Sequence, residues 1–168
     1  MINLTPETEQ RSISELEHLL TGPQTIEEVL NEAILREAER RGLEKGMQLV
    51  QGEIEEDVKR YIRQYTDSLF QLSLKTYERI SRELPSVKIT DFKTHLQPFS
   101  QELNLFVIIE ETDIETEIKV GLILAAIERE FLVSNNIFCE ILYARKGENL
   151  DIAAVKRDYP FSLRIPNA

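Results

Sequence analysis

Residues 102–144 read ELNLFVIIEETDIETEIKVGLILAAIEREFLVSNNIFCEILYA, and this stretch decides the fold. Two short runs rich in β-branched and aromatic residues, 102–109 and 137–144, flank a largely apolar segment, 114–133, which has the length of a helix. A strand, a helix and a second strand in this order form a βαβ unit, whose two strands are parallel. We therefore predict a small sheet covered by a crossover helix.

The sequence around this unit adds further short elements. Residues 87–92 alternate between apolar and polar and predict a strand before the unit, whereas residues 150–156 predict a short helix after it. Residues 161–165 follow Pro160, which is tolerated at a sheet edge, so we expect an edge strand there. Thr112 and Glu115 have the spacing of a capping box at the start of the crossover helix.

The first half of the chain reads as helical. Thr25 and Glu28 form a capping box, and Gly42, Gly46 and Gly52 predict a break between Arg41 and Glu53. Residues 53–84 then carry the strongest helical periodicity before Pro85 ends it. We predict an α+β fold with a helical region at 1–85, which offers a dimerisation surface, and a small α/β domain at 86–168 that holds a mixed sheet.

Composition narrows the class of protein. The 168 residues carry 20 Lys and Arg against 30 Asp and Glu, which gives a net charge of −10. Because nucleic acids and anionic membranes are bound through positive surfaces, neither is an expected partner. No apolar run approaches the ~18 residues of a membrane-spanning helix, and one cysteine excludes a disulfide framework. We expect a soluble, acidic, cytoplasmic protein.

The helix at 53–84 needs a partner along its length, because it would be longer than a domain of this size is wide. The partner is either the preceding helix or a second copy of the chain. We therefore predict a protein partner or self-association, as a dimer, through an apolar seam on this helix. Its residues are Ile54, Val58, Tyr61, Tyr65, Leu69 and Leu72.

The same helix carries the basic and aromatic residues Lys59, Arg60, Tyr61, Arg63 and Tyr65. Interleaved basic and aromatic side chains bind single-stranded nucleic acid by stacking and charge. The alternative is that the tyrosines belong to the seam and the arginines pair with neighbouring acids on the helix surface. The acidic net charge favours this second interpretation.

Thr25, followed by Glu28-Val29 and Glu32-Ala33-Ile34, gives residues 2–41 a pattern that resembles ribbon–helix–helix antitoxins. In that family a short N-terminal strand precedes two helices, and a glycine, here Gly22, closes the first. The resemblance implies a dimer whose paired strands read DNA. At the strand positions that would contact DNA, the only polar side chains of this chain are Asn3 and Thr5. The resemblance therefore implies the dimerising fold more strongly than DNA binding.

Glu102, Asn104 and Glu140 lie on the two strands of the βαβ unit, and residues two apart share a strand face. Residues 88–144 thereby resemble the small nucleotidyltransferase-like domains, in which two acids spaced by one residue and a third acid on the next strand hold Mg²⁺. Here Asn104 replaces an acid, and the Gly-Ser turn that grips phosphate is absent. The resemblance therefore implies a degenerate, inactive domain. The alternative is that Glu102 and Glu140 are ordinary solvent-facing strand residues.

No cysteine–histidine or serine–histidine arrangement appears at catalytic or metal-binding spacing. We therefore expect a non-enzymatic interaction or regulatory protein, antitoxin-like in its N-terminal part, that needs no cofactor. The alternative is the degenerate nucleotidyltransferase-like domain, with Mg²⁺ as its ion and Glu102, Asn104 and Glu140 as its site.

Overall fold

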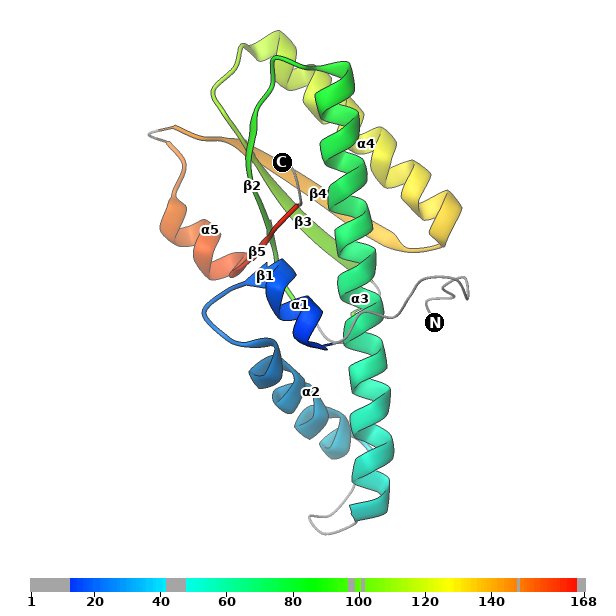
Figure 1. The fold of residues 1–168 in the computed structure, drawn as a ribbon. Coiled ribbons are helices and arrows are strands. Elements are labelled where there is room, and N and C mark those ends of the chain that lie inside the picture. The colour runs from blue at the N-terminus through cyan, green and yellow to red at the C-terminus, as the bar shows by residue number, and fades with distance from the viewer. Residues whose placement is uncertain (1–12, 42–47, 97–98, 101, 148, 166–168) are drawn as a thin grey trace.

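The computed structural model describes residues 13–41, 48–96, 99–100, 102–147 and 149–165. Its strands are β1 (Leu20–Thr21), β2 (Ile89–Thr94), β3 (Glu102–Ile109), β4 (Phe138–Arg145) and β5 (Phe161–Leu163). Its helices are α1 (Ile13–Leu19), α2 (Ile26–Arg40), α3 (Gln48–Glu83), α4 (Ile114–Asn135) and α5 (Ile152–Asp158). The predicted α+β class is confirmed, with helices dominating the first half and strands the second (Figure 1).

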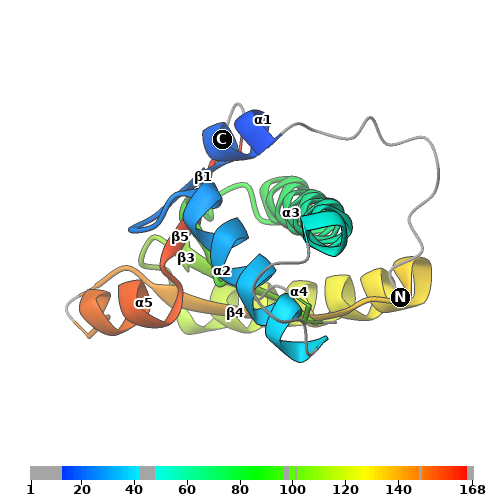
Figure 2. The ribbon, with the colours of Figure 1, turned by 90° about the horizontal axis from the view of Figure 1, so that it is seen from below.

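The strands form one mixed sheet in the order β1-β5-β2-β3-β4. β3 and β4 are parallel and are joined through α4, so the predicted βαβ unit is confirmed. All the other neighbouring pairs are antiparallel. α3 and α4 lie on one side of the sheet and α5 on the other (Figure 2). We call these sides the inner face and the outer face.

The inner face supplies the core because the alternate side chains of β3 point into it. Leu103, Leu105 and Val107 are fully buried there, beside Val120 and Ile127 of α4. α3 extends beyond the sheet, and its N-terminal half packs against α1 and α2 (Figure 1). One cluster of buried side chains runs through both parts, so Pro85 marks a change of secondary structure and not a gap in the core.

Several predicted boundaries are wrong, each for a local reason. α3 begins at Gln48 and not near Glu53, because the position of Gly52 is compatible with a continuing helix. The N-cap of α4 is Asp113, whose carboxylate accepts the Thr116 N–H, and not Thr112. β5 was expected at the edge of the sheet but lies inside it, because β1 pairs with its outer side. The two residues of β1, Leu20 and Thr21, were expected to continue the first helix. The strand expected near residues 2–5 lies outside the described residues.

The predicted seam on α3 is not exposed. Its side chains are covered by the chain's own α1, α2, α4 and sheet, so the expectation of a free apolar surface at this place is wrong. Ile54, Val58, Tyr65, Leu69 and Leu72 are buried and Tyr61 is half-buried. The alternative partner named for this helix, the preceding helix, is the one that the structure uses.

Two glycines give an opposite pair of predictions. A Cβ at Gly22 would lie 2.4 Å from Cδ1 of the buried Phe161 ring, whereas a Cβ at Gly52 would meet nothing within 4 Å. Gly22→Ala should therefore lower the free energy of unfolding by about 1–3 kcal/mol through overpacking. Gly52→Ala should raise it by about 1 kcal/mol, because glycine is a poor helix former. Urea denaturation of both variants measures this, and a Gly22→Ala protein as stable as wild type would contradict the expectation.

Candidate functional site

The structure places the three predicted site residues on the outer face of the sheet. In the parallel register of β3 and β4, Asn104 lies directly beside Glu140, and Glu102 lies beside Phe138. Glu102 and Glu140 are exposed, and Asn104 is half-buried. The predicted common face is therefore observed, although the position next to Glu102 holds an apolar ring and not a third acid.

The outer face is partly covered near these residues. Tyr159, at the end of α5, packs its ring on Phe106 with centroids 5.0 Å apart. Burial raises the pKa of the Tyr159 hydroxyl, and the negative charges of Glu140 and Asp158 raise it further. On the neighbouring strand Lys93 Nζ lies 3.0 Å from Asp91 Oδ2. Among the described residues Glu140 forms no ion pair, whereas Lys93 on β2 is paired with Asp91.

Within the described part of the chain, no three His, Cys, Asp or Glu side chains come together in a way that could hold a metal ion. Cys139 is a poor nucleophile, because burial raises the pKa of its thiol to about 12. The negative charge of Glu128 adds to this effect. The three predicted residues thus offer two carboxylates and one amide as oxygen ligands, which is fewer than a two-metal site requires.

A second candidate site lies between α2, α3 and the connection from β2 to β3. One cavity of about 570 Å³ is lined by α2, by the end of β2 and by the start of β5. A second cavity of about 480 Å³ lies between α2 and α3. Arg36 and Phe99 line both cavities, so the two adjoin at these side chains, and we call the pair the α2 groove.

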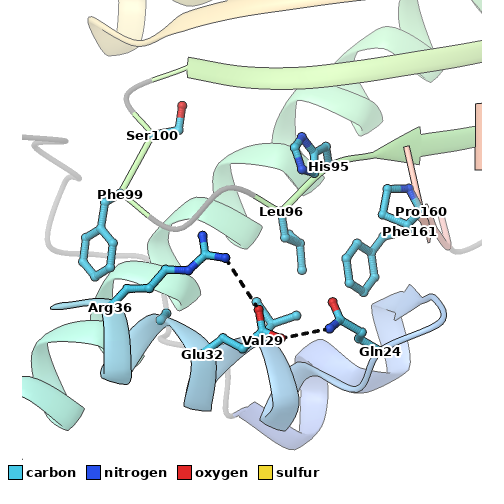
Figure 3. A pocket seen from close by; sticks show the side chains of 11 residues that line it. Gln24, Val29, Glu32, Arg36, His95, Leu96, Phe99, Ser100, Pro160 and Phe161 are labelled. Atoms are coloured by element: carbon cyan, nitrogen blue, oxygen red, sulfur yellow. Dashed lines mark hydrogen bonds and ion pairs between the residues drawn. The ribbon is translucent and has the colours of Figure 1, made fainter. Parts of the chain in front are cut away.

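Figure 3 shows the first cavity of the α2 groove. Glu32 and Arg36 rise from α2 on one side, and His95, Phe99 and Ser100 lie on the other. Glu32 is held by the Gln24 amide, whose Nε2 donates to Oε1 over 3.2 Å. The apolar part of the cavity lining comes from Val29, Ala33, Leu96, Pro160 and Phe161.

The second cavity is rich in arginine. Its lining includes Arg36, Arg40, Arg41 and Arg60 against two carboxylates, Glu37 and Asp57. The excess of positive charge is local, because the whole chain carries a net charge of −10.

A buried carboxylate holds two of these arginines. Glu37 is only 4% exposed. Its Oε2 accepts from Arg40 Nε over 2.7 Å, and its Oε1 accepts from Arg41 Nε over 2.7 Å. The Arg40 hydrogen bonds lower the pKa of Glu37 most strongly, and with those of Arg41 bring it to about 2 against the opposing effect of burial. Arg41 also reaches Asp57 on α3 at 3.2 Å, which ties the two helices together.

Tyr61 and Tyr65 fix the opposite wall of the α2 groove. Tyr61 donates to the Ser100 carbonyl and stacks on Phe99, with ring centroids 5.0 Å apart. Tyr65 donates toward the carbonyls of His95 and Glu102 over 3.3 and 3.2 Å. Two residues predicted for a seam therefore tie His95, Ser100 and Glu102 to α3.

Sequence reasoning missed the α2 groove. The available signal was the run REAERR at 36–41, in which Arg36 and Arg40 are one helical turn apart and Glu37 lies on the apolar side of the helix. The sequence pattern places Arg60 only among the basic and aromatic residues of its own helix and does not connect it with α2. Comparison of the chain with protein-family models, curated proteins and solved structures found no match.

Glu37 predicts a pH dependence of stability. Its pKa is lower in the folded protein than in the unfolded chain, so its contribution is fully present above about pH 4.3 and is lost as the pH falls toward 2. Glu37→Gln should lower the free energy of unfolding by roughly 2 kcal/mol at neutral pH. Urea denaturation over a pH series should show this difference shrinking in acid, and a difference independent of pH would contradict the argument.

Proposed function

We propose that this chain is a non-enzymatic interaction or regulatory protein that acts as a dimer through the outward face of α4. The support is an apolar surface that no other described residue covers, which we call the α4 stripe. Ile114, Ile118, Leu122 and Val133 form it and are 73%, 59%, 67% and 80% exposed. Large apolar side chains gathered on one exposed helix face are typical of contact surfaces. The α4 stripe takes the role that we first assigned to α3.

The charges beside the α4 stripe favour a second copy as its partner. Glu115 and Arg129 are both seven residues from Leu122, on the same face of the helix. Two antiparallel copies that cross at Leu122 therefore place Arg129 of one beside Glu115 of the other. Arg129 is exposed and has no ion pair within the described chain, so it is available for this contact.

One backbone group at the β4 edge of the sheet is already occupied, which disfavours the other common mode of association at that point. β4 is an edge strand, and edge strands pair readily with strands of other chains. Here the Ile141 N–H donates to Glu128 Oε1 of α4 over 2.6 Å. Because that backbone group is already satisfied, we favour helix–helix contact over strand pairing. No helix in the described ranges has the length and hydropathy needed to cross a membrane.

The dimer proposal predicts that Leu122→Glu shifts the chain toward the monomer. Removing a buried leucine from each copy costs roughly 3 kcal/mol, which weakens association by about a hundredfold. Sedimentation equilibrium measures this, with Ile152→Glu on α5 as the matched control at another exposed apolar residue. A wild-type chain that stays monomeric at all concentrations would overturn the proposal.

The charge arrangement has its own test. Arg129→Glu alone should weaken the dimer by repulsion, and the combined Glu115→Arg and Arg129→Glu variant should restore it. Failure of the double variant to recover affinity would reject the antiparallel arrangement while leaving the α4 stripe as the contact.

A degenerate nucleotidyltransferase-like domain is the second candidate, because Glu102, Asn104 and Glu140 share the outer face in register. Replacing the missing acid should then create a metal site. Asn104→Asp should bind Mn²⁺ at least about tenfold more tightly than wild type, and adding Glu140→Gln should remove the gain. Electron paramagnetic resonance of free Mn²⁺ follows this. Equal binding by wild type and Asn104→Asp would end the nucleotidyltransferase interpretation.

A further inference from the structure

The buried position of Glu37 needs an explanation beyond stability. Its side chain lies on the inner side of α2, where the neighbouring buried residues Val29, Leu30 and Ala33 are apolar. Replacing a buried ion pair by apolar residues of similar size is often neutral or stabilising, so the carboxylate is a poor means of holding α2 in place. Its clear effect is on geometry, because it fixes the guanidinium groups of Arg40 and Arg41 at the cavity.

The arginines so arranged keep exposed donors. The side chains of Arg36, Arg40 and Arg60 are 78%, 70% and 59% exposed. A guanidinium has five N–H donors, and Glu37 takes only two from Arg40. Arg60 is oriented by Asp57, and the nearest acid to Arg36, Glu32, is at 4.0 Å. Within the part of the chain that the structure describes, donors from both helices therefore remain free around one cavity.

The charge balance of this cavity matches a phosphate monoester. Among the described residues, four arginines and two carboxylates line it, which gives this part of the lining a net charge of +2. A phosphate monoester carries about −1.5 to −2 at neutral pH, and arginine forks are the side chains best suited to its oxygens. A polyanion is a worse match, because beyond the cavity it would meet the field of a chain with net charge −10.

The adjoining cavity supplies a place for the rest of the ligand. It adjoins the second cavity at Arg36 and Phe99, and the buried side chains of Phe161 and Leu96 contribute apolar atoms to its floor. At one rim the Gln24 amide and the Glu32 carboxylate offer hydrogen-bonding groups that are already fixed by their mutual contact (Figure 3). A small apolar floor with polar groups around it suits a planar heterocycle that carries donors and acceptors on its rim.

We propose that the α2 groove binds a nucleoside monophosphate. The phosphate lies among Arg36, Arg40 and Arg60, and the base lies in the adjoining cavity against Phe161 with its edge toward Gln24 and Glu32. Glu37 is a positioning residue that orients Arg40 and Arg41 without touching the ligand. This site is separate from the α4 stripe and from the acids of the outer face.

The test is calorimetric titration of the full chain with AMP, GMP, CMP and UMP, and separately with orthophosphate and adenosine. At least one monophosphate should bind about tenfold more tightly than orthophosphate and than adenosine, because only it occupies both cavities. If no monophosphate binds more tightly than orthophosphate, the proposal is overturned and the arginines hold at most a simple anion.

Variants locate the binding. Arg40→Gln and Arg60→Gln should each weaken the monophosphate by at least about tenfold, whereas Arg82→Gln, an exposed arginine farther along α3, should leave the affinity unchanged. Equal affinity in all three variants would place the ligand elsewhere and overturn the proposal. Leu122→Glu should bind normally, which separates this test from that of the dimer.

Glu37→Met tests the positioning role. Methionine keeps an unbranched side chain of similar size at the buried site, so the protein should remain folded by circular dichroism and urea denaturation. The monophosphate affinity should nevertheless fall by about tenfold, because Arg40 and Arg41 lose their fixed orientation. A folded Glu37→Met protein with wild-type affinity would reject the role of Glu37.

Discussion

Burial of α3 along its whole length is the constraint on which the rest of the structure depends. A helix of 36 residues is about 54 Å long, and its apolar side cannot be left in water. The inner face of the sheet and α4 cover its C-terminal half, while α1 and α2 cover the N-terminal half that extends beyond the sheet (Figure 1). The helical half of the chain therefore has no core of its own and shares one with the sheet.

The α2 groove is a consequence of this arrangement. α2 packs beside α3, and Tyr61 and Tyr65 of α3 bind the carbonyls of Ser100 and His95. The side chains of these parts leave a cavity between them. Both walls are fixed by polar contacts, at one end through Arg41 and Asp57 and at the other through the tyrosine hydroxyls. A cavity with walls fixed in this way is preorganised, which is the property that a binding site needs.

The elements of the second half follow from sequence because their signals are local. The strand at 102–109 is found at its predicted bounds, and α4 begins at the predicted residue 114, since a β-rich run and a long apolar helical segment leave few alternatives. The position of α3's partner could not be read in the same way. Periodicity shows that Ile54 or Leu69 must be covered, but the covering atoms come from α1, α2 and the sheet, which are distant in sequence.

The same distinction separates the two candidate sites. Glu102, Asn104 and Glu140 could be placed on one face because strand parity is a rule of local geometry, and the parallel register then follows from the βαβ unit. The α2 groove joins Arg36 and Arg40 of α2 to Arg60 of α3 and Phe99 of the β2–β3 connection, and no pattern within one element links them. The informative clue was Glu37, an acid at an apolar position of an amphipathic helix. A residue that breaks the periodicity of its own helix costs stability unless charged partners surround it, so such breaks are where sequence reasoning should look for a site.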